Sequence, residues 1–225
     1  QLEMRFKEAD EKYAYQLLLG LEAFQHGGEN DNLNGRTNVE LDNRLVVIDM
    51  SMFADTGQAP LFMHVMFDWI YQRAQSSDRR TQVTIDEAHY LLRRAATTDM
   101  IDLFIRHSRH FNTAITLISQ TVDEFIAKSD KKSEEAVEKA RNVYNLCDIK
   151  QIFHHESVSD AMIDFHGLAP SEQNFIATAQ TGEDGGYSEC LLAVNDWTKS
   201  LALHVNDYEI HVLDDDLDPW EYLVN

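Results

Sequence analysis

The sequence predicts an α/β domain with a mostly parallel sheet between helices and an antiparallel edge at the C-terminal end. Short apolar runs rich in β-branched residues alternate with segments of helical periodicity through most of the chain. Polar or acidic residues follow directly on two of these runs. Strand-like segments joined by short turns come together near the C-terminus, as in an antiparallel sheet.

The elements follow from the spacing of apolar residues and from the glycines, prolines and asparagines between them. We expect one domain over 1–225 with an acidic tail at 214–225. The expected helices lie at 2–26, 59–76, 98–110, 121–146 with a break near Ser129-Asp130, 157–166 and 170–178. The expected strands lie at 45–50, 81–85, 114–118, 149–153, 187–195, 199–205 and 207–213.

The composition is that of a globular protein with an acidic surface. The 225 residues are 44% hydrophobic and 26% charged, which allows a buried core. An excess of 39 acidic over 19 basic side chains gives a net charge of -20, which disfavours non-specific binding of this chain to nucleic-acid phosphates. The scarcity of lysine suggests a high-salt source, and loss of folding at low salt would support that hypothesis. No apolar run approaches the roughly 20 residues of a membrane helix, so we expect no direct membrane insertion.

The segment Val83-Thr84-Ile85-Asp86-Glu87 has the form of a Walker B motif, an apolar strand that ends in two acids. Ligands of open α/β sheets bind at the carboxyl ends of the strands. There Asp86 would reach the water shell of a magnesium ion, and Glu87 would orient and polarise the water that attacks the γ-phosphate of ATP. The alternative is a strand that runs into an acid-capped helix.

Two further features favour a nucleotide site. The next expected strand ends in Ser119-Gln120, so that Gln120 would lie beside the two acids and could sense the γ-phosphate or hold the water. The helix before that strand carries Arg106 and Arg109, and an arginine near a subunit edge could reach the nucleotide of a neighbour. Alternatively, Gln120 caps a strand and the arginines are solvated.

The glycine-rich phosphate loop of such enzymes, G-x-x-x-x-G-K-[ST], does not occur in the sequence. Without it the phosphates have no backbone cradle and no lysine, so we expect this chain alone to be inactive. The loop normally precedes the Walker B strand. We therefore expect it upstream of Gln1 in a longer protein.

These residues together resemble the C-terminal motor domain of the conjugal-transfer ATPases of type IV secretion systems, the VirB-four or TraC-like family of the HerA–FtsK group. The resemblance extends over about residues 17–213. The segments that carry it are Leu33 to Val39, Asn43 to Asp49, Asp86 to His89, Ser108 to Asn112, Leu117 to Gln120 and Gly167 to Glu172.

The resemblance implies a RecA-like P-loop NTPase fold and ATP hydrolysis with magnesium in a homo-hexamer. It further implies coupling to pilus assembly or to transfer of DNA or protein, partners in the secretion machinery, and a cytoplasmic location at a membrane complex. It assigns magnesium binding to Asp86, water activation to Glu87 and γ-phosphate sensing to Gln120, with Arg109 as first and Arg106 as second candidate for the arginine finger. The sequence departs from the family in the missing loop and at His110, where a second basic residue is usual.

Other functions remain open at this point. Asp86-Glu87-Ala88-His89 is also the box of DEAH helicases, and a DNA-translocating HerA/FtsK-like motor or a non-catalytic RecA-like interaction module would share the strand pattern. A metal site from His154, His155, Glu156, Asp164 and His166 is a further hypothesis, although the spacing fits no common zinc pattern. Cys147 and Cys190 are expected to be free thiols.

Overall fold

The computed structural model describes residues 11–31, 34–35, 43–49, 59–76, 79–92, 95–126, 134–182, 186–195 and 197–206. The chain divides into two compact units, Gln1–Asp49 and Met50–Asn225, and each is described by itself. The single domain expected over 1–225 stays a prediction, because the compactness of each unit does not test how the two associate.

The first unit contains helix α2, Glu11–Glu22. The helix expected at 2–26 is shorter in its described part, since the chain turns after Glu22 and Gly27 has a φ of 84°. Further on, the strand expected at 45–50 is wrong for residues 45–49, which form no strand, and Leu45 and Val47 are 81% and 83% exposed. A β-branched run becomes a buried strand only when neighbouring strands pair with its edges, and no described strand pairs with this segment.

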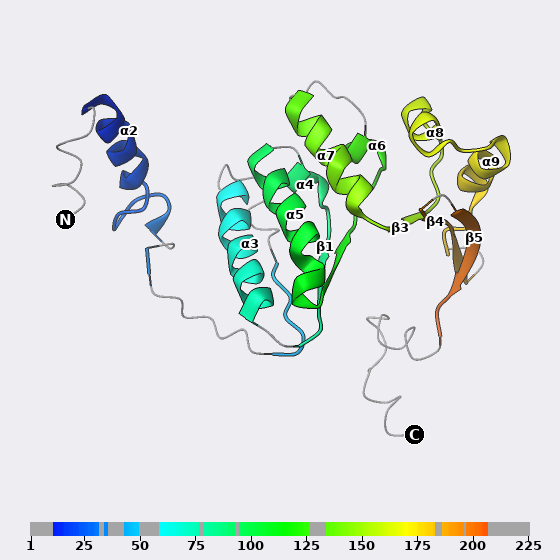
Figure 1. Ribbon diagram of the computed structural model, residues 1–225, viewed down its shortest axis with the longest axis horizontal. Coiled ribbons are helices and arrows are strands. Elements are labelled where there is room, and N and C mark those ends of the chain that lie inside the picture. The colour runs from blue at the N-terminus through cyan, green and yellow to red at the C-terminus, as the bar shows by residue number, and fades with distance from the viewer. Residues whose placement is uncertain are drawn as a thin grey trace. The chain divides into compact units, whose positions relative to one another are not determined.

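The described part of the second unit begins with a helix, which is followed by a strand, two helices, a 3-10 turn and a second strand that pairs in parallel with the first. The register runs from Thr81 opposite Thr113 to Ile85 opposite Leu117. Figure 1 shows α5 between α3 and α7. The elements are α3 (Ala59–Ser76), β1 (Thr81–Ile85), α4 (His89–Leu92), α5 (Ala95–Ser108), η3 (Arg109–Phe111) and β2 (Thr113–Leu117).

The rest of the second unit is a set of helices and a separate antiparallel sheet in the order β3-β4-β5. The α/β expectation is confirmed, with one difference. The antiparallel strands were expected at the edge of the parallel sheet, whereas in the described residues they form a sheet of their own around β4. The strand expected at 207–213 and the tail lie outside the described residues. The elements are α6 (Asp123–Ile126), α7 (Glu134–Leu146), β3 (Ile149–Ile152), α8 (Asp160–His166), α9 (Pro170–Thr178), β4 (Tyr187–Val194) and β5 (Trp197–His204).

One hydrophobic core joins these elements. Its members come from α3 to α9 and from β3 and β4, and Leu92, Ile126, Val143 and Ile176 are fully buried in it. The helices that follow the turn after β1 and the segment after β2, α4 and α6, are both packed into this core, which fixes the positions of the two segments. Among the described residues, no helix combines the length and the apolar character that a membrane crossing requires.

Candidate active site

The two acids expected at the end of a strand lie in the turn that follows β1. This turn is tied to the end of β2, because the Ile118 amide donates to the Ile85 carbonyl at 2.9 Å and the Ala88 amide donates to the Ile118 carbonyl at 2.8 Å. The backbone of Glu87 has a φ of 49°, in the left-handed region that non-glycine residues adopt uncommonly. Backbone hydrogen bonds between the two segments thus continue past the end of β1, and they fix the backbone position of Glu87.

The carboxylate of Glu87 has a neighbour at each oxygen. Gln120, which follows β2, donates from Nε2 to Oε1 at 2.7 Å. His89, the first residue of α4, places Nδ1 2.9 Å from Oε2. The Glu87 side chain is 40% exposed while the His89 side chain is 8% exposed. The structure therefore brings Glu87 and Gln120 together as expected from the sequence, and adds His89, which the sequence argument missed.

Asp86 is exposed beside Glu87. Its Oδ1 accepts a hydrogen bond of 2.8 Å from the Glu87 backbone amide, which fixes the direction of the side chain. A carboxylate has about four acceptor positions, so others remain for water. An exposed carboxylate with acceptor capacity left is the donor that hydrated magnesium prefers, and the residues here fit that ion.

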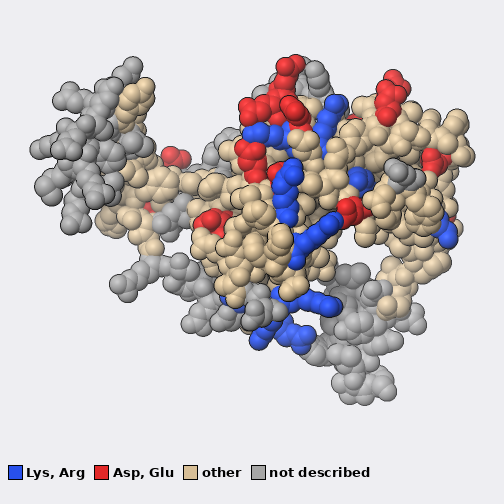
Figure 2. Space-filling view, in the orientation of Figure 1, with Lys and Arg blue, Asp and Glu red and all other residues tan. Residues whose placement is uncertain are grey.

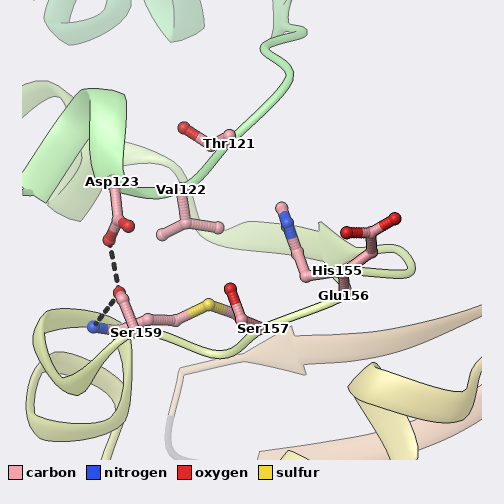
Figure 3. A pocket seen from close by; sticks show the side chains of 8 residues that line it. Thr121, Val122, Asp123, His155, Glu156, Ser157 and Ser159 are labelled. Atoms are coloured by element: carbon pink, nitrogen blue, oxygen red, sulfur yellow. Dashed lines mark hydrogen bonds between the residues drawn. The ribbon is translucent and has the colours of Figure 1, made fainter.

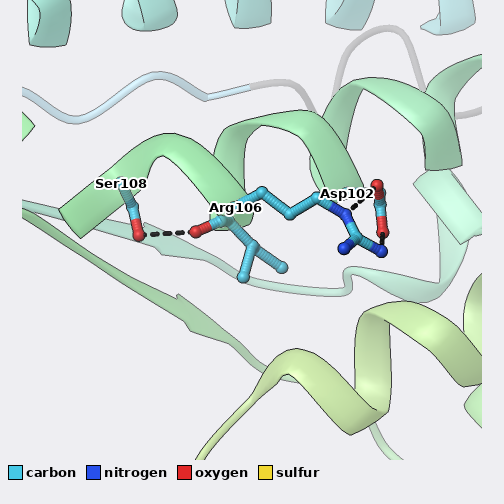
Figure 4. A network of polar contacts seen from close by, with 4 residues as sticks. Asp102, Arg106 and Ser108 are labelled. Carbon is cyan, nitrogen blue, oxygen red and sulfur yellow. Dashed lines mark hydrogen bonds and ion pairs between the residues drawn. The ribbon is translucent and has the colours of Figure 1, made fainter. Parts of the chain in front are cut away.

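The structure does not bring Arg106 or Arg109 to these acids. Both precede β2, whereas Gln120 follows it, and a strand of five residues spans about 16 Å. Arg106 forms a two-point ion pair with Asp102 one turn earlier on α5, with Nε–Oδ2 at 2.7 Å and Nη2–Oδ1 at 3.0 Å (Figure 4). The hydrogen bond to Asp102, with the attraction of its charge, raises the pKa of Arg106.

Arg109 lines an open hollow of about 480 Å³ at the amino ends of the two parallel strands. Arg80 lines the same hollow, together with polar residues such as Gln82 and Asn112. Figure 2 shows basic side chains along the face of α5 and α7 toward the lower edge of the view, although the chain as a whole is acidic. Arg80 and Arg109 thus lie at the amino ends of β1 and β2, whereas Asp86 and Glu87 lie at the carboxyl end of β1.

A polar cavity of about 170 Å³, which was not predicted from the sequence, lies close to Gln120 in the chain, because Thr121, the next residue, is one of those that line it (Figure 3). Ser159 links its two sides, since its hydroxyl donates to Asp123 Oδ1 at 2.6 Å and accepts from the Met162 amide at 3.1 Å as the N-cap of α8. Burial lowers the pKa of His155, which also lines the cavity. The spacing of a serine before an apolar helix could have indicated the cap, but not its contact with Asp123 across 36 residues.

The metal hypothesis for the histidines finds no support in the described part of the chain, where no group of three or more His, Cys, Asp and Glu side chains is placed to hold an ion. His166 instead forms a hydrogen bond of 2.7 Å between Nε2 and the Tyr144 hydroxyl. Cys147 and Cys190 are free thiols, as expected, and burial raises the pKa of both.

Comparisons with known proteins identify the fold. No protein-family model matches the sequence, and no curated protein sequence matches it either. Among solved structures, VirB4 of Thermoanaerobacter pseudethanolicus is similar over 93% of this chain, with a TM-score of 0.69 and 21% sequence identity. The chain spans about half of that protein, 54% of its length. The expected RecA-like α/β fold is thereby confirmed, and so is the resemblance to the VirB-four family at the level of the fold.

Proposed function

We propose that this chain is the C-terminal part of a RecA-like motor ATPase of the type IV secretion or conjugation class, and that it supplies the acidic wall of the active site. The observation that carries the proposal is the 2.7 Å hydrogen bond between Gln120 and Glu87, which joins the carboxyl ends of β1 and β2. Ligands of open α/β sheets bind at such strand ends. The shared fold with VirB4 supports the motor class.

In this proposal Glu87 is the general base. Its carboxylate accepts the proton of the attacking water and holds that water by a hydrogen bond as it moves toward the γ-phosphate of ATP. Gln120 senses the γ-phosphate, because the side-chain amide that donates to Glu87 can donate to a phosphate oxygen instead. Asp86 holds the water shell of magnesium, an ion that when bound offsets the negative charge of the phosphates. The phosphate loop comes from a part of the protein outside this chain.

Arg109 is proposed to act on the nucleotide of a neighbouring subunit in a ring of six. Its place at the amino end of β2 separates it from Glu87 of its own chain by the length of the strand, about 16 Å. Its side chain is 79% exposed, so it is available to a neighbour. The proposed ring would be coupled to secretion machinery and would move DNA or protein during transfer or pilus assembly.

The substitution Glu87→Gln in the longer protein that contains the phosphate loop tests the proposal. The amide keeps the shape of the side chain but cannot accept the proton, so we expect kcat to fall by at least about 100-fold while ATP affinity stays within a few-fold. Phosphate release measures the first quantity and a fluorescent ATP analogue measures the second. Glu138→Gln, an exposed acid on α7, is the matched control and should leave both unchanged.

Two outcomes would count against the proposal. Wild-type turnover in the Glu87→Gln protein would remove Glu87 from the chemistry. Absence of ATP binding and hydrolysis in the unmodified longer protein would favour the alternative of a RecA-like interaction module without catalysis.

A further inference from the structure

His89 faces the carboxylate of Glu87 from inside the protein. It is the first residue of α4, its side chain is 8% exposed, and its ring packs on Tyr90 with centroids 4.2 Å apart. Ala88, which precedes it, and Leu91, two residues after it, belong to the buried core and are 0% and 2% exposed. The imidazole is therefore held in one place, with Nδ1 2.9 Å from Glu87 Oε2.

The two oxygens of Glu87 have different surroundings. Oε1 accepts a hydrogen bond from Gln120, an exposed side chain in the segment after β2. Oε2 is buried, although the Glu87 side chain as a whole is 40% exposed, and it accepts no hydrogen bond of regular geometry in the described structure. The polar atom close to it is His89 Nδ1, 2.9 Å away, at the distance of an ion pair when the imidazole is protonated. A buried carboxylate oxygen is costly without a polar neighbour, so Oε2 is the fixed end of the carboxylate. Oε1 is the end whose partner can change.

We propose that His89 is a positioning residue that anchors Glu87 through Oε2. This inference rests on the proposed function. When the Gln120 amide turns to a phosphate oxygen, it gives up Oε1, and one of the two contacts that hold the carboxylate is lost. The contact with His89 remains, so Oε1 stays directed toward the water that it deprotonates. Orientation of a base against its substrate is a large part of its effect, and small displacements cost much of the rate.

The contact itself is tested in the 225-residue chain by ¹⁵N NMR of the histidine rings, without any nucleotide. The His89 signals are assigned by their loss in His89→Asn. We expect Glu87→Gln to shift the His89 Nδ1 signal, because the charged neighbour of that atom is removed. Gln120→Ala should leave the signal in place, since Gln120 holds the other oxygen. A spectrum that Glu87→Gln leaves unchanged would overturn the proposed anchor.

The role of the contact is tested by steady-state ATP hydrolysis in the longer protein. His89→Leu removes the polar atom, and we expect kcat to fall by at least about tenfold while KM for ATP stays within about twofold. His89→Asn keeps an amide N–H near the position of Nδ1 and should restore most of kcat. His64→Leu, an exposed histidine on α3, is the control for the change of side chain and should behave as wild type.

The possible failures can be told apart. If Glu87→Gln abolishes hydrolysis but His89→Leu keeps wild-type kcat, the proposed function stands and the role of His89 is refuted. If His89→Asn loses as much activity as His89→Leu, or if KM rises while kcat is unchanged, His89 serves the structure and does not orient the base. If Glu87→Gln keeps its turnover, the proposed function and the inference fall together.

Discussion

Arg109 and Asp148 form an ion pair beside the amino end of β2, with Arg109 Nη2 2.5 Å from Asp148 Oδ2. Both side chains are largely exposed, 79% and 60%, so the pair contributes little to the free energy of unfolding, at most about 1 kcal/mol. The weakness of the pair matters for the proposed motor. An arginine that is held loosely by its own chain can exchange Asp148 for a phosphate of a neighbouring subunit.

The first prediction concerns Arg109→Ala in rings of the longer protein. If Arg109 acts on the neighbour, each site needs Glu87 from one subunit and Arg109 from the next. Rings of Arg109→Ala alone and of Glu87→Gln alone should both be inactive. We expect an equal mixture of the two proteins to regain about a quarter of the active sites, those in which an intact Glu87 lies next to an intact Arg109 of the neighbour. Phosphate release from the mixed rings measures this, and mixtures that stay inactive would contradict a role in trans.

Two variants serve as controls for that experiment. Arg106→Ala removes an arginine that is already bound at two points by Asp102 of the same helix, and rings of this variant should retain ATPase activity. Asp148→Asn breaks the ion pair but keeps Arg109, and it should retain ATPase activity. If Asp148→Asn lost as much activity as Arg109→Ala, the ion pair itself would be the requirement.

Much of the second unit could be predicted from the sequence, because its signals are local. The apolar runs of β1 and β2 and the two acids after β1 are where periodicity and strand-end chemistry place them. Gln120 could be placed beside Glu87 because parallel strands bring their carboxyl ends to the same edge of a sheet. The roles of these residues in catalysis remain proposals.

The features that the sequence did not predict depend on contacts between distant residues or on uncommon backbone conformations. The Arg109–Asp148 pair joins residues 39 apart, and no spacing rule covers it. The approach of His89 to Glu87 depends on the left-handed φ of Glu87, which no preference of glutamate indicates. The strand expected at 45–50 had the composition of a buried strand, but pairing decides whether such a run becomes one.

The second prediction is that the purified 225-residue chain shows no measurable ATPase activity. The chain contains the proposed base and the proposed magnesium ligand but not the glycine-rich loop that cradles the phosphates. A coupled assay for phosphate release, with the Glu87→Gln chain as the blank, measures the activity. Turnover above that blank would mean that the phosphates bind somewhere in this chain, and the proposed site would have to be revised.

The third prediction concerns Gly167, which ends α8 with a φ of 64°. A side chain would meet no atom there within 4 Å, so the cost of adding one comes from the backbone conformation alone. We expect Gly167→Ala to lower the free energy of unfolding by about 1 kcal/mol, and Gly167→Asn to lower it less because asparagine tolerates this conformation. Gly20→Ala, within α2 and also without contacts, is the control and should not destabilise the protein. Equal effects of the two alanines in urea unfolding would contradict the assignment of the cost to φ.

The last prediction concerns the hydrogen-bonded pair of the buried Tyr144 and the partly buried His166. Burial, with a smaller contribution from the positive charge of Lys150, lowers the pKa of His166, and burial raises the pKa of Tyr144. The imidazole in its neutral form and the Tyr144 hydroxyl share a hydrogen bond of 2.7 Å through Nε2. Below the ordinary histidine pKa of about 6.5 the unfolded chain binds a proton that the folded protein does not, so unfolding becomes easier as the pH falls and the contribution is complete above that value.

The substitution His166→Gln tests this sign, because the amide carbonyl can accept from Tyr144 but is not protonated in this range. We expect the free energy of unfolding to fall less between about pH 7 and pH 5 in this variant than in the wild type, as measured by urea unfolding at each pH. His64→Gln, an exposed histidine on α3, should keep the wild-type slope. Burial also lowers the pKa of His155, so part of the slope should persist in His166→Gln and disappear only in the double variant. A wild-type slope in His166→Gln would show that the Tyr144–His166 pair does not contribute to acid sensitivity, and that other groups carry it.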